Sequence, residues 1–152
     1  MAEAERGIAV NRKALHDFEI LSSVEAGLVL TGTEIKSIRE GRVNLREAFA
    51  RGEKGELWLY ACNIAPYAQG NRFNHEPTRP RKLLLHKQEI AELSSQMEQK
   101  GLTLIPLRMY FKRGRAKLQL AVGRGRKSYD KRAAIADRDA QRQIARALRQ
   151  NA

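Results

Sequence analysis

The sequence predicts a mainly β protein with inserted helices, in which a small antiparallel β-barrel is followed by a basic C-terminal tail. Three observations predict this fold. Short runs rich in Leu, Ile, Val and aromatic residues recur along the chain. Tight turns containing Gly join some of these runs, and two stretches between them show helical spacing. We therefore expect a barrel domain over residues 1–122 and a tail over residues 123–152.

The first strands are predicted between residues 18 and 30. Residues 1–10 are expected to be frayed. The runs Phe18–Leu21 and Leu28–Leu30 have strand-like composition, and the chain between them is interrupted near Gly27. We expect two short strands here rather than a long one.

A short helix is predicted next. Thr31 and Glu34 have the spacing of a capping box, in which each side chain satisfies a backbone N–H of the first turn. Ile35 and Ile38 follow at helical spacing, and Gly41 is a natural end.

The middle of the chain is predicted to form a hairpin followed by a loop. Val43–Arg51 alternates apolar and polar residues, and Leu57–Asn63 is rich in Leu, Trp and Tyr. The segment Gly52–Gly55 between them has the composition of a hairpin turn. Pro66–Arg81 is long, polar and proline-containing, which is typical of a loop that is either functional or mobile.

The remaining elements are a helix and a second hairpin. Leu83–Lys100 contains apolar residues at helical spacing and ends before Gly101. Leu102–Lys112 and Ala116–Val122 are β-type runs joined by the turn Arg113–Arg115. Six short strands with two helices resemble the five-stranded oligonucleotide-binding barrel more than any other small β architecture.

The charge of the chain favours a polyanionic partner. Its 152 residues contain 29 Lys+Arg and 17 Asp+Glu, a net charge of +12. Nucleic acid is the leading partner for such a protein, and an anionic membrane surface is second. The longest apolar run, Leu57–Cys62, is far below the roughly 20 residues that span a bilayer. The first residues lack a leader pattern, and the single cysteine excludes an internal disulfide, so we expect a cytoplasmic protein.

The last thirty residues hold half of this charge. They contain nine Lys or Arg and three Asp, a net of +6, and few large apolar residues. We expect this tail to be disordered when free. As a helix it would place Arg138, Arg142 and Arg146 in one stripe opposite a face that is mostly alanine. Gly123 and Gly125 are expected to form a flexible joint.

No pattern in the sequence predicts a catalyst, a cofactor or a metal site. His16, His75 and His86 are not at metal-ligand spacing. Asp17 and Glu19 would share a strand face and could hold Mg²⁺. Charged residues on a strand face are more commonly just exposed to solvent, and we favour this interpretation. A small metal-dependent ribonuclease that uses these two carboxylates and His16 remains a third hypothesis.

The segment from residue 11 to residue 18 is a candidate RNA-binding surface. Arg12 and Lys13 would hold phosphates, Asn11 and His16 would read edges of bases, and Phe18 offers a stacking face. The alternative is an amphipathic edge strand with Phe18 in the core.

Glu25 is an acid beside Ala26 and Gly27 in a basic protein. A carboxylate that contacts RNA accepts hydrogen bonds from base amino groups or ribose 2′-hydroxyls. An equally good interpretation is that Glu25 simply occupies a turn and does not contact RNA.

A second basic cluster precedes the predicted long helix. Arg79, Arg81 and Lys82 place three cations within four residues, and nearby prolines stiffen the backbone. The run Leu83–Leu85 is too apolar to be fully exposed. We expect one leucine to face outward as a platform for a base and two to anchor the loop.

These segments resemble the small protein B family, the SsrA-binding (tmRNA-binding) proteins of bacteria. The resemblance runs in order from about residue 11 to residue 132. It is carried by the following motifs: Asn11-Arg-Lys, His16-Asp-Phe-Glu-Ile20, Glu25-Ala-Gly27, Thr31-Gly-Thr-Glu-Ile-Lys-Ser37, Arg39-Glu-Gly-Arg-Val-Asn44, Gly70-Asn-Arg-Phe-Asn-His75, Arg79-Pro-Arg-Lys-Leu-Leu-Leu-His86, Gly101-Leu-Thr-Leu104, Gly125-Arg-Lys127 and Asp130-Lys-Arg132.

The resemblance implies an adaptor without enzymatic activity. Such a protein binds the tRNA-like domain of tmRNA and, together with elongation factor Tu, delivers it to stalled ribosomes for trans-translation. The barrel takes the place of the anticodon arm that tmRNA lacks. A generic ribosome-associated RNA-binding protein is the alternative. We expect a monomer whose partners are tmRNA and the decoding site and message channel of the small ribosomal subunit.

The resemblance also implies roles for individual residues. Asn11, Glu25 and Leu84 fall on the tmRNA-contacting positions, and His16 lies beside them. Leu15 and Phe18 differ from the Arg and Tyr that are common in the family, which removes a phosphate contact and a hydroxyl.

The tail motif needed on the ribosome corresponds to Asp130, Lys131 and Arg132, with Gly125, Arg126 and Lys127 before it. We hypothesise that the tail becomes helical in an empty message channel and so tests whether the channel is vacant. A generic basic tail that adds affinity for any RNA is the alternative.

Overall fold

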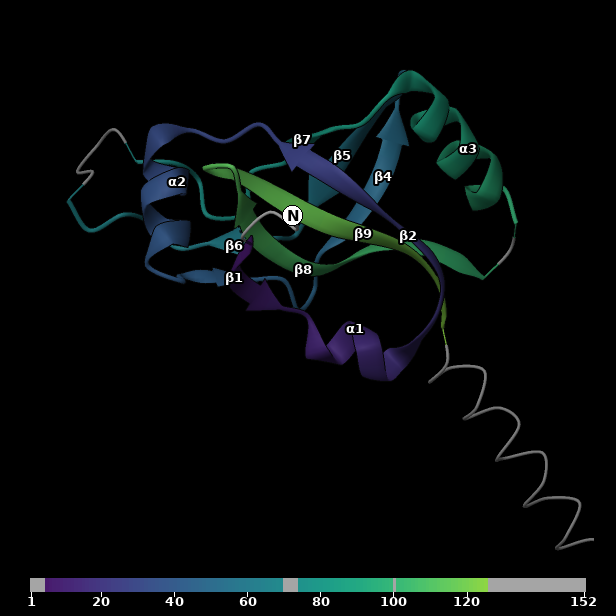
Figure 1. The fold of residues 1–152 in the computed structure, drawn as a ribbon, viewed down its shortest axis with the longest axis horizontal. Helices are drawn as coiled ribbons and strands as arrows, with labels where there is room; N and C mark the ends of the chain where they lie inside the picture. Colours follow the sequence, from purple (N-terminus) through teal and green to yellow (C-terminus); the bar gives the residue numbers. More distant parts are fainter. Residues whose placement is uncertain (1–4, 70–73, 100, 126–152) are drawn as a thin grey trace, which may run out of the picture.

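The computed structural model describes residues 5–69, 74–99 and 101–125. Seven strands of this part of the chain form one antiparallel sheet in the order β1-β8-β4-β5-β7-β2-β9, and β9 also pairs with β8, so that the sheet closes on itself (Figure 1). The strands of this sheet are β1 (Glu5–Val10), β2 (Phe18–Leu28), β4 (Phe49–Glu53), β5 (Glu56–Tyr60), β7 (Arg81–Leu84), β8 (Leu102–Lys112) and β9 (Arg115–Gly125). The prediction of a mainly β, barrel-like fold is confirmed.

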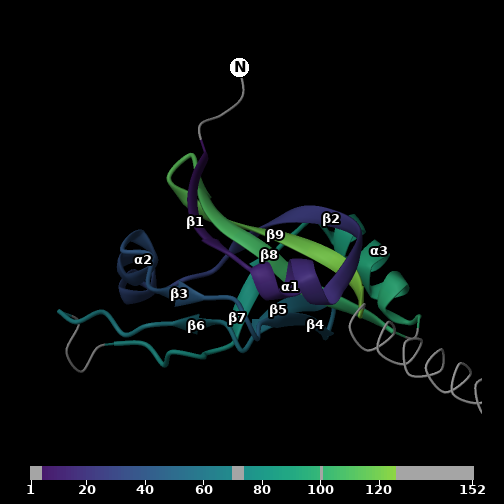
Figure 2. The same cartoon turned by 90° about the horizontal axis from the view of Figure 1, so that it is seen from below.

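A smaller sheet and three helices surround the barrel. Strands β3 (Val43–Asn44) and β6 (Asn63–Ile64) form a two-stranded sheet. Helix α2 (Gly32–Arg39) lies beside this small sheet, and α3 (Lys87–Met97) lies at the opposite end of the molecule (Figures 1 and 2). Within the described part of the chain, no helix is long and apolar enough to cross a membrane.

Both predicted hairpins are present and have the same turn chemistry. Lys54 and Gly55 join β4 to β5, and Arg113 and Gly114 join β8 to β9; all four residues have positive φ, between 50° and 77°. Two central residues of positive φ match the twist of the flanking strands, and glycine adopts this conformation without steric cost. The local sequence therefore determines both turns.

The predicted capping box is confirmed at the start of α2. The Thr31 hydroxyl accepts a hydrogen bond from the Glu34 N–H, and the Glu34 carboxylate accepts one from the Thr31 N–H at 2.8 Å. Helix α3 begins and ends inside the stretch that was predicted to contain it, and its buried residue is Leu93.

The N-terminal region differs from the prediction in two ways. Residues 5–10 are not frayed but form β1, because their backbone pairs with the long strand β8. Residues 18–28 form one continuous strand, β2, because β9 pairs along almost its whole length. A break near Gly27 does not occur, since the partner strand overrides the local preference of a glycine.

Helix α1 (Arg12–Asp17) was not predicted either. The alternative reading of this segment as an edge strand is wrong, because the Asn11 side chain caps a helical turn by accepting a hydrogen bond from the Ala14 N–H. The end of β9 also differs from expectation. This strand includes Gly123 and Gly125, so these glycines are paired with β2 rather than forming a joint.

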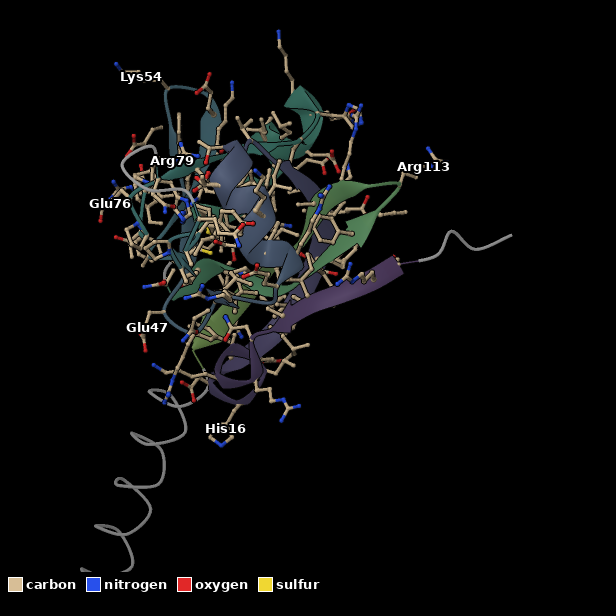
Figure 3. The ribbon with its side chains drawn as sticks, turned by 90° about the vertical axis from the view of Figure 1, so that its left-hand side faces the viewer. His16, Glu47, Lys54, Glu76, Arg79 and Arg113 are labelled. Atoms are coloured by element: carbon tan, nitrogen blue, oxygen red, sulfur yellow. The ribbon has the colours of Figure 1, made fainter. Side chains whose placement is uncertain are left out.

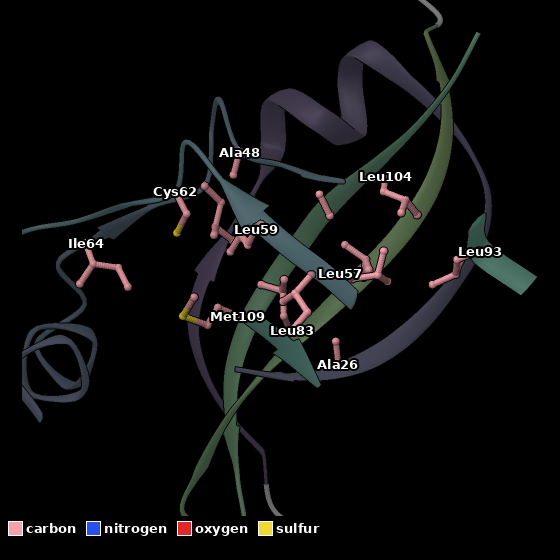
Figure 4. Packing of buried hydrophobic residues seen from close by; sticks show 14 of the residues in the cluster. Ala26, Ala48, Leu57, Leu59, Cys62, Ile64, Leu83, Leu93, Leu104 and Met109 are labelled. Atoms are coloured by element: carbon pink, nitrogen blue, oxygen red, sulfur yellow. The ribbon is translucent and has the colours of Figure 1, made fainter. Parts of the chain in front are cut away.

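The core lies inside the closed sheet. Its buried side chains come from most strands and from α2 and α3 (Figure 4). Cys62 is one of them and is fully buried, as a small apolar residue. Because strands of the closed sheet present alternate residues to this core, the intervening residues form an outer face that is available to a partner.

Candidate nucleic-acid interface

Glu25 lies on the outer face of the barrel, where β2, β9 and β8 run side by side. Its carboxylate Oε2 accepts a hydrogen bond from the Tyr110 hydroxyl at 2.5 Å and another from Lys112 Nζ at 3.3 Å. These contacts lower the pKa of Glu25, with the Tyr110 hydrogen bond as the main cause. The side chain is 37% exposed, so the structure presents an ionised acceptor on the surface.

Leu84 is the outward-facing leucine of its run. It is 50% exposed, whereas Leu83 is 1% exposed and belongs to the core. The expectation that one leucine faces outward is therefore confirmed, and the residue is Leu84.

Gly27 allows Leu84 to lie close to the backbone of β2. The two residues are paired across β2 and β7, and a Cβ atom at Gly27 would lie 3.2 Å from the Leu84 Cβ. Leu84 also borders a hollow of 300 Å³ with Phe111, Arg115 and Lys117. An apolar wall with a cationic rim suits a nucleotide.

Asn11 is not available for the base contact that was predicted. Its side chain is almost fully buried, and its amide donates hydrogen bonds at 2.9 Å to the carbonyl oxygens of Leu45 and Pro106. Together with the cap on Ala14 N–H, these bonds fix α1 to the barrel. The structure thus gives Asn11 a positioning role.

The cations of α1 reach the surface to different extents. Arg12 is exposed, and Lys13 forms an ion pair with Glu47 at 2.7 Å. The His16 ring lies 2.9 Å from Asp17 and projects into solvent from the end of α1 (Figure 3). This helix therefore offers positive and hydrogen-bonding groups on one exposed surface.

Phe18 contributes to packing rather than to an open stacking face. It packs on a small buried cluster that includes Ala14 and Ile105. A Cβ atom at Gly123 would lie 3.1 Å from the Phe18 Cβ, so β9 approaches this ring closely. The alternative prediction was wrong in making this segment an edge strand, but its placement of Phe18 against the core describes this residue better than an open stacking face does.

The second basic cluster is divided between the interior and the surface. Arg81 is fully buried, and its guanidinium donates to Glu34 at 2.5 Å and to the carbonyl oxygens of Cys62 and Pro77 at 2.5 and 3.0 Å. The predicted phosphate contact of Arg81 is wrong, because all of these bonds hold the fold together.

The neighbouring cations are more accessible. Arg79 donates to the other oxygen of Glu34 at 2.6 Å and is partly exposed. Burial would raise the pKa of Glu34, but hydrogen bonds from Arg79, Thr31 and Arg81 outweigh it and lower the pKa. Lys82 reaches outward to Glu56 at 3.1 Å. Arg79 and Lys82 thus remain candidates for contact with phosphate.

Sequence reasoning missed the partners of Glu25. Tyr110 and Lys112 are more than 80 residues away and reach Glu25 through the pairing of β2 and β8 with β9. Strand registers were needed to find them, and the sequence carried no local signal for this contact.

The described residues contain no group of three His, Cys, Asp or Glu side chains that could hold a metal ion. The predicted tail residues after Gly125 lie outside the described part of the chain. They are Arg126, Lys127, Asp130, Lys131, Arg132, Arg138, Arg142 and Arg146.

Comparison with known proteins gives consistent matches over almost the whole chain. A family model described as SmpB protein matches residues 8–150. The SsrA-binding protein of Carboxydothermus hydrogenoformans is 61% identical over 145 residues, which cover 95% of this chain and 97% of the relative. The SsrA-binding protein of Desulforudis audaxviator is 59% identical over 147 residues, which cover 97% and 96%.

A solved structure also matches. It is named "tmRNA-SmpB: a journey to the center of the bacterial ribosome", and a chain in it is 52% identical to this one with a TM-score of 0.68. The match covers 80% of this chain and 85% of the other.

Proposed function

The chain belongs to the SmpB protein family, and we propose that it binds the tRNA-like domain of tmRNA and delivers it to stalled ribosomes for trans-translation. The protein acts as a cytoplasmic adaptor and performs no chemical step itself. Elongation factor Tu is an indirect partner, because it carries the charged tmRNA.

The observation that supports the RNA-binding role best is the outward placement of Glu25 and Leu84. In a protein of net charge +12, cations alone would give binding to any RNA. An ionised carboxylate accepts hydrogen bonds from RNA donors and repels phosphate, while an exposed leucine beside it covers the face of a base. These two groups favour a particular folded RNA.

The remaining residues of this interface divide into two kinds. The first kind contacts phosphates or base edges from the surface. It consists of the exposed residues Arg12 and His16 and the partly exposed residues Lys13, Arg79 and Lys82. The second kind supports the interface from inside the protein. Its members fix α1 and β7 to the barrel or allow β2 to lie close to Leu84. It consists of Asn11, Phe18, Gly27 and Arg81.

The tail acts at a different place. Its Arg stripe, Arg138, Arg142 and Arg146, suits a channel lined with RNA phosphate, and a full-length message would occupy the same space. The tail therefore becomes helical in the vacant channel of the small subunit, with Asp130–Arg132 near the decoding site. Coupling of folding to an empty channel restricts delivery to stalled ribosomes.

The experiment is a reconstituted assay that measures peptide tagging on ribosomes stalled at the end of a truncated message. We expect full tagging with the wild-type chain and strong loss with a tail of scrambled order and unchanged composition. Both proteins should bind tmRNA equally. Full tagging with the scrambled tail would contradict the coupling and favour a generic basic tail.

Incubation of labelled RNA with the protein and Mg²⁺ tests the ribonuclease hypothesis. We expect the RNA to stay intact. Cleavage that disappears in Asp17→Asn would instead support catalysis by the carboxylates beside His16.

A further inference from the structure

Tyr110 occupies the centre of a polar network on the outer face of β2, β9, β8 and β1. The residue is 3% exposed, yet its hydroxyl reaches the surface group Glu25 and donates to its Oε2 at 2.5 Å. A buried ring therefore places a hydroxyl directly beneath an exposed carboxylate.

The ring of Tyr110 is itself held in place. The Arg108 guanidinium lies 4.2 Å from the ring centroid, at a cation–π distance. Arg108 in turn donates to Gln119 at 3.0 Å and to Glu5 at 3.1 Å, and Gln119 donates to Ser23 at 3.2 Å. Arg108 and Glu25 thus contact this tyrosine directly, and side chains of β1 and β9 hold Arg108 in place.

The arrangement orients the carboxylate of Glu25. Both hydrogen bonds that the described residues make to it, from Tyr110 and from Lys112, end on Oε2. No described residue donates a hydrogen bond to Oε1, which therefore keeps its acceptor capacity. A carboxylate fixed in this way loses little side-chain entropy when it accepts a further hydrogen bond.

We propose that Tyr110 is a positioning residue for tmRNA recognition, which holds Glu25 so that Oε1 accepts a hydrogen bond from a ribose hydroxyl or a base amino group. The inference rests on the proposed function and adds to it a residue that does not itself touch RNA. Lys112 assists as the second donor. Specificity then depends on a tyrosine beneath the contact surface.

The chain contains a matched control for this tyrosine. Tyr60 donates to Glu53 at 2.6 Å, also with an arginine over its ring, since Arg51 lies 4.9 Å from the ring centroid. This pair lies on the hairpin of β4 and β5, and neither of its members bonds to Glu25, Tyr110 or Leu84. Removal of the Tyr60 hydroxyl breaks the same kind of bond without affecting the interface.

The first test measures binding of full-length Tyr110→Phe and Tyr60→Phe to the tRNA-like domain and to an unrelated folded RNA of equal length. We expect Tyr110→Phe to weaken cognate binding about tenfold, because Glu25 is no longer held in place for its hydrogen bond to RNA, and to leave binding of the unrelated RNA unchanged. Tyr60→Phe should change neither affinity.

A second readout separates positioning from a general structural role. The groups around Glu25 are Tyr110 and Lys112 on β8 and Lys117 on β9, with Arg108 and Glu5 behind the tyrosine. The Tyr110 hydrogen bond lowers the pKa of Glu25, so Tyr110→Phe should raise it. The Glu25 carboxyl resonance and cognate binding should then both titrate at a higher pH than in the wild type.

Modified RNA distinguishes whether a ribose hydroxyl or a base amino group donates the hydrogen bond to Glu25. Single 2′-deoxy substitutions remove a hydroxyl, and inosine in place of guanosine removes an amino group. We expect one such change to weaken binding to the wild type about tenfold and to have no further effect on Tyr110→Phe or Glu25→Ala. Additive losses at every position would overturn the proposal.

Two results of the binding test would contradict the positioning role of Tyr110. If Tyr110→Phe keeps wild-type preference for the cognate RNA, or weakens both RNAs equally, the positioning role is wrong. If the wild type itself shows no preference, the proposed function fails rather than the role of Tyr110. If the wild type prefers the cognate RNA, a negative result with Tyr110→Phe therefore concerns the role of Tyr110 alone and not the proposed function.

Discussion

Glu25 and Glu34 accept similar hydrogen bonds but differ in burial. Each accepts hydrogen bonds from two side chains and has a lowered pKa, but Glu25 is 37% exposed whereas Glu34 is 0% exposed. The partners of Glu34, Arg79 and Arg81, tie α2 to β7 and the preceding loop. Burial, rather than residue type, therefore separates the carboxylate that holds the fold together from the carboxylate that we propose contacts RNA.

The largest expected effect comes from breaking the buried cluster. Arg81→Met leaves Glu34 without its buried partner and should lower the free energy of unfolding by about 3–5 kcal/mol. The matched change Lys82→Met removes an exposed pair with Glu56 and should cost less than about 1 kcal/mol. Urea unfolding followed by circular dichroism measures both. Equal losses would show that burial is not the deciding difference.

The same cluster predicts a dependence of stability on pH. The folded-state pKa of Glu34 is below its usual value of 4.5, so its contribution is complete above that value and is lost as pH falls through the folded pKa. The urea midpoint should therefore decrease on acidification below about pH 5. Glu34→Gln should be less stable at pH 7 and should show a flatter profile. If the urea midpoints of Glu34→Gln and wild type changed with pH in the same way, Glu34 would not be the source of the pH dependence.

Glu25→Ala should affect binding far more than stability. Loss of the charged acceptor should weaken cognate RNA about ten- to hundredfold, because hydrogen bonds to charged groups carry about 1.5–3 kcal/mol. Glu53→Ala, which removes the corresponding glutamate of the Tyr60 pair, is the control and should leave binding unchanged. Similar binding losses in both variants would mean that only overall charge matters.

Leu84→Ala should have a smaller effect. Loss of an apolar contact with a base should weaken cognate binding about five- to tenfold, in proportion to the apolar area removed. Leu21 is similarly exposed, at 45% against 50%, and Leu21→Ala provides the control. Equal effects of the two changes on binding would remove Leu84 from the interface.

Arg12→Gln should have the smallest effect and should not distinguish between RNAs. Arg12 is exposed on α1, and loss of one phosphate contact should reduce the slope of log affinity against log salt by less than about 1 for both RNAs. A change in the preference for cognate RNA would instead give Arg12 a role in specificity.

The sequence predicted those parts of the fold that depend on local chemistry. The Thr31 capping box and the turns at Gly55 and Gly114 need only their own residues, and all were found. Strand β1 and the full length of β2 were missed, because both depend on pairing with distant strands, β8 and β9.

The candidate site divides along the same line. Glu25 and Leu84, which the family resemblance singled out, are surface groups, whereas Asn11 and Arg81 were expected to contact RNA and are buried. Their partners are distant in sequence: Arg81 bonds to Glu34, which is 47 residues away, and Asn11 bonds to Pro106, which is 95 residues away. A basic or amide side chain in a motif carries no local signal that its hydrogen bonds are used internally.

We propose that the outer face around Glu25 gives the protein its preference for tmRNA. A filter-binding titration of wild type and Glu25→Ala against the tRNA-like domain and an unrelated RNA, repeated across salt concentrations, tests it directly. We predict a wide margin for the tRNA-like domain in the wild type and loss of that margin in Glu25→Ala. Equal binding of both RNAs with a steep salt slope, or an undiminished margin in Glu25→Ala, would contradict the claim.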